Sequence, residues 1–382
     1  MSNVLTALAP VLYTAAQVVS NEPYACLKGI TTSYDDKSVA KGDTVYVPIA
    51  PVRALTDFTP AAITTQGDDS TPTNVGVQIT FAKKASWYLT GEQVQSLENG
   101  GDNAKEMARQ WLLQGMRSLR NYAEADAAAQ IKSGASRAYG TAGTNPFATD
   151  LSGLTNMYKI LKDNGAPMAD LQLVIDTTAA LSLRNQQIIQ MAYQAGGDSE
   201  RRSGNFLEQF GFNIQESAGI VSHTKGTGTL YVFNGAHALG AQAITAKTGS
   251  GTIVAGDILA AQNDANNKYV ANGVAGTSVL TAPGTFNIGR PGLKVAHVDA
   301  ETITVGNNYT PNLAFERTAV MGVFRPPYMP ENPTITQMKI SDASGLTFLL
   351  CEIAQYGQRS WELHLAGGTK VVQGEHVGIL LG

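Results

Sequence analysis

The longest periodic pattern of apolar positions predicts one long helix over residues 103–132. Apolar or small residues recur at the i, i+3, i+4, i+7 spacing of a single helix face; they are Ala104, Met107, Ala108, Trp111, Leu112, Gly115, Leu119, Tyr122, Ala123, Ala127 and Ile131. The charged residues mostly fall off this stripe; they are Lys105, Glu106, Arg109, Arg117, Arg120, Glu124 and Lys132. Asn103 with Glu106 forms a capping box, and Gly134 marks the end. At 1.5 Å per residue the helix would be roughly 45 Å long.

Before this helix, the pattern predicts an N-terminal segment that docks on a core and an extended two-stranded arm. Residues 4–19 show helical spacing interrupted by Pro10. Residues 43–50 and 75–81 alternate apolar and polar side chains, as strands do. The connection between these strands exceeds the roughly 12–15 residues usual for a loop in a compact domain. We therefore expect this arm either to be an insertion or to be held by a partner. A short helix over 89–97 is expected to lead into the long helix.

After a Gly-, Thr- and Ser-rich turn, a compact α/β pattern follows the long helix. The expected elements are a helix over 151–161 capped by Thr149 or Asp150, a strand over 171–175, a helix capped by Thr178 that extends to Tyr193, a short helix over 206–210 and a strand over 214–221. Helices and strands that alternate in this way indicate a helix-covered sheet.

Between Lys225 and Val305 the helix signal almost disappears. Short β-like runs alternate with Gly, Asn and Pro turns; the runs are 229–233, 243–246, 251–254, 269–271, 293–297 and 302–305. The clearest is 252–259, which we expect to be a strand, an Ala-Gly-Asp turn and a second strand. The sequence therefore predicts a small all-β insertion here.

The C-terminal part is predicted to be rich in strands. Residues 313–325 are expected to return to the α/β core as a helix or a strand. The strands that follow are expected at 335–340, 346–356, 359–365, 369–372 and 377–381, with Gly367-Gly368 as a hairpin turn. The expected fold class is α+β.

The composition favours close contacts with other chains. Charged residues make up 15 % of 382, which is low for a soluble globular protein, and glycine is abundant at 39. A net charge of −4 argues against nucleic-acid recognition as the main role, because that role requires a basic face.

Residues 1–19 lack the basic start and cleavage site of a signal peptide. No apolar run reaches the length of about 18 residues that predicts a membrane span.

No catalytic, cofactor-binding or metal-binding constellation is predicted. Five scattered histidines are expected to be exposed or hydrogen-bonded; they are His223, His237, His297, His364 and His376. Residues 241–248 approach a phosphate-binding loop but carry Ala at both required glycines. Gly226-x-Gly228 and Gly249-x-Gly251 are expected as turns, and the pairs Asp35-Asp36 and Asp68-Asp69 as solvated loop residues, with a cation site as the less favoured alternative. Cys26 and Cys351 lack a metal or redox spacing, so we expect two reduced, buried thiols in a cytoplasmic protein.

The order of these elements is more specific than any one of them. Two local stretches add to it: residues 249–259 (GSGTIVAGDIL) and residues 312–327 (NLAFERTAVMGVFRPP). In this order, and in these two stretches, the chain resembles the major capsid (coat) protein of tailed bacteriophages, which has the Hong Kong 97 fold. It is most similar to the short-tailed Salmonella-phage type, which has an insertion domain. The first stretch is similar to the opening hairpin of that insertion, and the second to the segment that re-enters the core.

The resemblance implies a role for each part of the chain. It implies an N-arm at 1–39, an extended β-hairpin loop at 40–86, a peripheral domain with the spine helix at 87–149, an axial domain at 150–224 and 306–334, a β insertion domain at 225–305, and C-terminal strands of both domains at 335–382.

The function that the resemblance implies is structural. The chain would self-assemble through hexamers and pentamers into an icosahedral shell around double-stranded DNA, with non-specific DNA contact, no cofactor and no membrane. Scaffolding, portal and decoration proteins are the implied partners, and the implied location is the virion, after assembly in the host cytoplasm. A bacterial surface or carbohydrate-binding β-rich protein is the alternative, and an α/β hydrolase-like enzyme is the third hypothesis.

Overall fold

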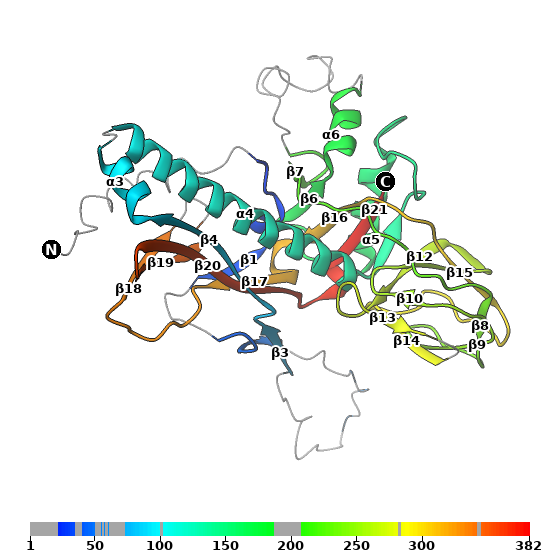
Figure 1. Ribbon diagram of the computed structural model, residues 1–382. Helices are drawn as coiled ribbons and strands as arrows, with labels where there is room; N and C mark the ends of the chain where they lie inside the picture. Colours follow the sequence, from blue (N-terminus) through cyan, green and yellow to red (C-terminus); the bar gives the residue numbers. More distant parts are fainter. Residues whose placement is uncertain are drawn as a thin grey trace.

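The computed structural model describes residues 22–34, 40–49, 55, 57, 60, 73–99, 102–186, 208–281, 284–341 and 345–382. The predicted helix over 4–19, both acidic pairs and the segment 187–207 lie outside these residues. The fold is mixed α and β, with two main sheets, and one long helix crosses the middle of the molecule (Figure 1).

The predicted long helix is confirmed as α4 (Asp102–Gly134), which is about 50 Å long at 1.5 Å per residue. Its buried face includes Leu112, Met116 and Ala123, each 0 % exposed. Two details of the predicted face were wrong. Tyr122 is 41 % exposed, whereas Arg120 and Glu124 are 1 % and 2 % exposed. The N-terminal segment covers the polar flank of the helix, so the buried surface is wider than the apolar stripe alone indicates.

The first sheet lies under α4 and contains six strands. In order, they are β1 (Thr31–Tyr34), β17 (Val320–Arg325), β20 (Gln358–Val371), β19 (Thr347–Gln355) and β18 (Ile335–Ser341), with β4 (Phe81–Thr90) also paired to β20. Phe324, Leu363 and Leu365 from this sheet share one hydrophobic cluster with Leu112 and Met116 of α4. This cluster fixes the helix on the sheet.

The short helix expected at 89–97 is confirmed as α3 (Gly91–Asn99), displaced by two residues because residues 81–90 first continue as a strand paired with β20. One prediction about this sheet was wrong. Gly367 and Gly368 are not a hairpin turn but lie within β20. A Cβ on Gly368 would lie 2.1 Å from the Gln78 carbonyl oxygen, so glycine allows the base of the arm to approach the sheet.

The second sheet has a helix-covered part with the alternating helices and strands that the sequence predicts, but the helix expected to extend to Tyr193 ends at Arg184, and residues 208–210 are not helical. It contains β5 (Arg137–Tyr139), β21 (Val377–Leu381), β16 (Pro311–Glu316), β6 (Leu171–Ile175) and β7 (Phe212–Glu216). The helices α5 (Ser152–Asp163) and α6 (Thr177–Arg184) share a hydrophobic cluster with β6. The α6 cap is Asp176, whose carboxylate accepts from the Thr178 amide, and not Thr178 itself. The strand expected at 214–221 begins and ends earlier, as β7.

The segment 313–325 is neither one helix nor one strand. It forms the end of β16, a short 3-10 helix at Arg317–Ala319, and then β17. Because β16 and β17 belong to different sheets, the chain passes from one sheet to the other at this helix.

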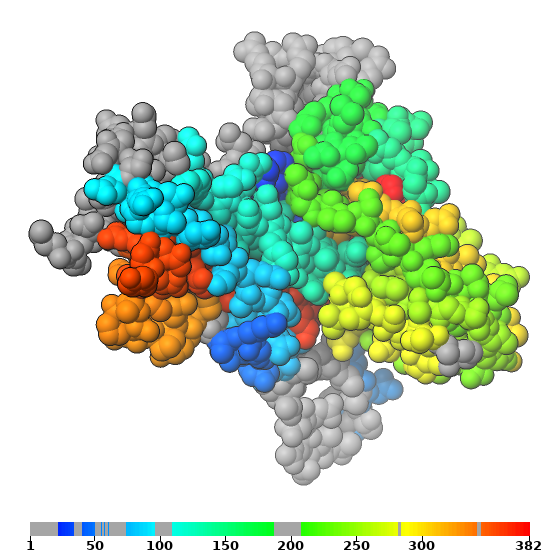
Figure 2. Space-filling model, viewed as in Figure 1, coloured from blue at the N-terminus to red at the C-terminus, as the bar shows by residue number. Residues whose placement is uncertain are grey.

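Residues 231–305 form a closed ring of strands, which we call the barrel. Its members are β8 (Tyr231–Phe233), β9 (Ala243–Lys247), β14 (Gly284–Ile288), β12 (Asp264–Asn272), β11 (Ile258–Ala261) and β15 (Thr302–Val305). Each pairs with the next, and β15 pairs with β8, which closes the ring. Apolar side chains including Phe233, Phe286 and Tyr269 fill it and leave a cavity of about 20 Å³. The residues of the barrel gather in one lobe on the right of Figure 2.

The strand, turn and second strand expected at 252–259 are confirmed, but the two strands do not pair with each other, so the hairpin that the resemblance implied was wrong. Strand β10 (Ile253–Val254) pairs with β13 (Ser278–Leu280), whereas β11 pairs with β12 and β15. The buried Asp257 carboxylate accepts from the amides of Val254 and Gly226, and it thereby turns the chain from one strand pair to the other.

The predicted two-stranded arm is confirmed as far as the structure describes it. Strands β2 (Thr44–Ile49) and β3 (Thr73–Gln78) pair in an unbroken antiparallel register. Its base rests on the first sheet through a small cluster of Val77, Ile79, Val323 and Ala366. Figure 1 shows the strands projecting away from the body.

Candidate assembly elements

The N-terminal segment, residues 22–30, lies along the polar flank of α4. The Glu22 carboxylate accepts from Arg117, with a distance of 2.9 Å to Nε, and also from Asn121. The Tyr24 ring stacks on the Arg120 guanidinium, 3.9 Å from ring centroid to Cζ. These α4 residues follow the i, i+3, i+4 spacing of one helix face, so consecutive positions of the segment meet successive helix positions.

Glu124 lies four residues after Arg120, on the same face of α4, and is buried. Its carboxylate accepts from the amides of Ala25, Cys26 and Leu27 at 2.8–3.0 Å, and from the Ser217 hydroxyl at 2.6 Å. A buried carboxylate is tolerated only when donors replace the water that it loses. The helix α2 (Cys26–Gly29) is thus held on α4 by one side chain. The apolar stripe did not single out Glu124; the available signal in the sequence was a charged residue seven positions after Arg117, on the same row of the helix.

The linker, residues 217–223, leads from β7 toward the barrel and is held by a second buried polar group. The Lys132 Nζ lies 3.1 Å from His223 Nδ1, and His223 Nε2 lies 2.8 Å from the Asp257 carboxylate. The lysine donates to Nδ1, so the imidazole proton is assigned to Nε2 and is donated to Asp257. Desolvation by burial lowers the pKa of Lys132. The group joins the end of α4 to the base of the barrel.

Of the remaining histidines, only His237 and His297 lie together: they pair through their backbones, and both rings pack on Phe233. His297 is 1 % exposed, stacks on Phe233 at 4.7 Å between ring centroids and contacts Glu301 at 2.6 Å. Burial lowers the pKa of His364, which lies 3.1 Å from Glu362. His376 is buried, and His237 contacts Thr245. Within the described residues, no three His, Cys, Asp or Glu side chains gather as metal ligands do.

The glycine pairs are positions of close backbone approach. A Cβ on Gly226 would lie 2.2 Å from the Thr252 oxygen, and one on Gly251 would lie 2.3 Å from the Thr227 oxygen. The two turns therefore pack against each other and offer no phosphate cradle. The loop-like stretch 241–248 contains strand β9 instead.

Both cysteines are buried and form no disulfide. Burial raises the pKa of the Cys26 thiol, and the neighbouring Glu124 carboxylate raises it further. Burial also raises the pKa of Cys351, to about 11. Both side chains therefore remain thiols at neutral pH and behave as small core residues.

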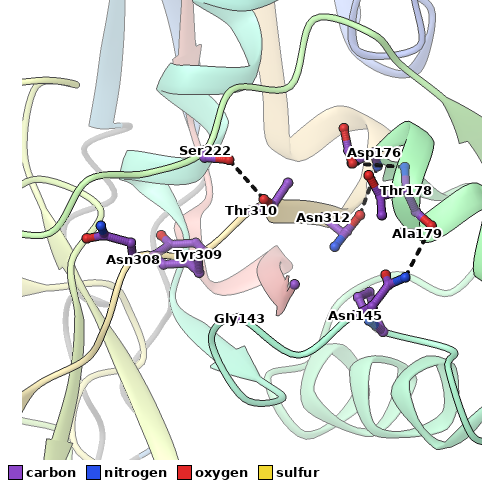
Figure 3. Close-up of a pocket in the computed structure, with 12 residues that line it drawn as sticks. Gly143, Asn145, Asp176, Thr178, Ala179, Ser222, Asn308, Tyr309, Thr310 and Asn312 are labelled. Atoms are coloured by element: carbon purple, nitrogen blue, oxygen red, sulfur yellow. Dashed lines mark hydrogen bonds between the residues drawn. The ribbon is translucent and has the colours of Figure 1, made fainter.

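A polar cavity of about 300 Å³ lies where the helix-covered part of the second sheet meets the connections to the barrel (Figure 3). Its polar side chains bond to one another or to the backbone. Ser222 contacts Thr310 at 3.0 Å, and the Asn312 side chain accepts from the Asp176 amide and donates to the Leu380 carbonyl. Because these polar groups already hydrogen-bond within the protein, we assign no ligand to this cavity.

The arm exposes apolar side chains. Tyr46 of β2 is 68 % exposed, and Leu55, in the connection between the strands, is 98 % exposed. In contrast, Val77 and Ile79 at the base are 0 % and 1 % exposed. Tyr46 alternates with Val45 and Val47, which pack on the base cluster, so one face of the arm presents surface that the rest of this chain does not cover.

The structure contains no helix, within the residues it describes, that is long and apolar enough to cross a membrane.

No protein-family model matches the chain, and no curated protein matches it. Among solved structures, it is similar to the capsid of the cyanophage P-SCSP1u, at 14 % identity over 95 % of this chain and 90 % of that one, with a TM-score of 0.52. Weaker similarities include Mycobacterium phage Che8 (14 %, 96 % and 90 %, TM-score 0.47) and a virus-like particle from Pyrococcus furiosus (11 %, 98 % and 97 %, TM-score 0.46). The similarity to the cyanophage capsid shows that the chain has the fold of a phage capsid protein.

Proposed function

We propose that the chain is the major capsid protein of a tailed bacteriophage, which self-assembles into an icosahedral shell around double-stranded DNA. The observation that carries this proposal is the similarity in fold to the cyanophage capsid over 95 % of this chain. A chain whose whole length matches a shell subunit has no large part left for an unrelated activity, so the proposed role is structural and not enzymatic.

The proposed division of the chain follows the Hong Kong 97 pattern. Residues 1–39 are the N-arm, 40–86 the extended loop, and α4 the spine helix. In the short-tailed Salmonella-phage type of subunit, the barrel within 225–305 would be the insertion domain. Its own hydrophobic cluster and its position between β7 and β16 support this assignment.

Self-association would use the surfaces that the single chain leaves exposed. The exposed face of the arm, with Tyr46, and the connection that contains Leu55 would lie on a neighbouring subunit within hexamers and pentamers. Rings of this kind require heterologous contacts, in which different patches of two copies meet. Scaffolding, portal and decoration proteins and non-specific contact with packaged DNA complete the proposed set of partners. The subunit would assemble in the host cytoplasm and remain in the virion.

Electron microscopy and light scattering of the purified full-length chain test the proposal. We expect closed shells, open sheets, or rings of five and six subunits, either from the chain alone or when it is co-expressed with a scaffolding protein. A monomer under both conditions and at all concentrations would overturn it.

A loop replacement tests the role of the arm. Residues 51–72 are replaced by a short glycine linker that keeps β2 and β3 paired. We expect a folded monomer that forms no shells, because the surface for the neighbour is gone. A control with a Gly/Ser loop of the original length separates lost contacts from a shortened reach. Intact shells from both variants would show that the arm is dispensable.

A further inference from the structure

We propose that Glu124 couples the N-terminal segment to the linker, so that docking of either one on α4 stabilises the other. The two segments are far apart in sequence but meet at this carboxylate, which is 2 % exposed. The proposal concerns contacts within one chain, and its test requires no shell.

The N-terminal segment supplies most of the donors. The amides of Ala25 and Cys26 share Glu124 Oε1, and the Leu27 amide donates to Oε2. If the segment left, the charge would lose these donors while still buried under the linker, which is strongly unfavourable.

The linker supplies the remaining donor and closes the site. The Ser217 hydroxyl donates to Oε1 at 2.6 Å and accepts from the Gly219 amide at 3.1 Å. The Ala218 amide donates to the Pro23 carbonyl at 3.3 Å, a direct bond between the two segments. A Cβ on Gly219 would lie 2.6 Å from Glu124 Cγ, so the backbone of the linker rests on this side chain.

Beyond this point the linker follows α4 to Lys132. Ile220 is buried in the cluster under the helix, and His223 ends the path between Lys132 and Asp257 at the base of the barrel. From Glu124 to Lys132 the helix rises about 12 Å. One face of α4 thus holds the N-terminal segment and then the linker, with Glu124 as the residue that both share.

Coupling of this kind is reciprocal. Each segment brings donors that make the buried carboxylate tolerable, so each lowers the free-energy cost of placing the other. By linkage, losing the linker's hydrogen bond to Glu124 must loosen the N-terminal segment by the same factor as losing the segment's hydrogen bonds to Glu124 loosens the linker.

Hydrogen exchange on the full-length chain tests the coupling. We expect Ser217→Ala to increase exchange at the amides of Ala25, Cys26 and Leu27 by about tenfold, because a hydrogen bond to a charged group is lost. Conversely, Tyr24→Ala should increase exchange over residues 219–223. Glu124→Gln should increase hydrogen exchange in both places, at residues 25–27 and at residues 219–223.

Ser222→Ala is the matched control. Ser222 is a serine of the same linker, but its hydroxyl contacts Thr310 and not Glu124. It should leave exchange at residues 25–27 unchanged. Wild-type protection of residues 25–27 in Ser217→Ala would overturn the coupling, and so would an equal loss of protection in Ser222→Ala, because that result indicates general loosening. Circular dichroism of each variant confirms that it is folded.

Discussion

The barrel and the arm are both built from antiparallel strands, but they differ in how the edges of their strands are paired. The barrel closes six strands into a ring, so every ring strand has a partner on both sides and the apolar side chains face inward. The arm pairs only two strands, and its apolar contacts with the body are confined to its base.

This difference shows which part is stable by itself and which part depends on its surroundings. Closure removes the unpaired edges through which strands associate, and an enclosed core supplies the stabilising burial. A two-stranded ribbon in water is at best marginally stable. We therefore expect the barrel to keep its structure without neighbours, and the arm to be ordered mainly by its base and by contacts between subunits.

The largest predicted effect is in the barrel core. Phe286 is 3 % exposed and lies on the ring interior. Phe286→Ala should lower the free energy of unfolding of the barrel by about 3–5 kcal/mol, since it removes burial and leaves a cavity. Urea titration followed by hydrogen exchange of the barrel amides measures it. A loss under 1 kcal/mol would show that the ring does not depend on its enclosed core.

A smaller effect is expected at the base of the arm. Ile79 is 1 % exposed, but its cluster has few members. Ile79→Ala should cost about 2 kcal/mol, at the low end for such a truncation, and should increase exchange in β2 and β3. Tyr46→Ala, on the exposed part of the arm, is the control and should change monomer stability by less than about 0.5 kcal/mol. Equal losses from the two variants would contradict the division between the buried cluster and the exposed face of the arm.

The smallest predicted effect is the change with pH in the stability of the docked N-terminal segment. Hydrogen bonds from Arg117 and then Asn121 lower the pKa of Glu22 from its usual 4.5. A depressed carboxylate stabilises the docked segment above its unfolded pKa, and this contribution is lost as the pH falls below 4.5 and through the folded pKa. Exchange at residues 24–27 should therefore rise in acid. Glu22→Gln should make the Glu22 contribution independent of pH, so a variant with the full wild-type acid response would exclude Glu22 as its source.

The elements with strong local patterns could be predicted from the sequence. The 3.6-residue period gave α4 to within two residues at each end, and the strands at 171–175 and 377–381 match β6 and β21. These predictions held because periodic burial on one face is a property of neighbouring residues.

The positions that failed depend on partners distant in sequence. Gly367 and Gly368 have the local chemistry of a turn but lie within a strand, because the backbone of the arm approaches them. The segment 252–259 has the pattern of a hairpin, but the buried Asp257 directs its two halves to different partners. In each case the outcome rests on contacts that no window of neighbouring residues contains.

The sequence by itself determined the periodic elements, because one helix or strand face suffices to specify them. Only the tertiary structure decided the closure of the barrel and the burial of Glu124. Closure requires β15 to meet β8 across some 70 residues of chain. A glutamate on a helix flank is ordinarily solvated. Glu124 is buried only because the amides of residues 25–27 and the Ser217 hydroxyl donate hydrogen bonds to its carboxylate.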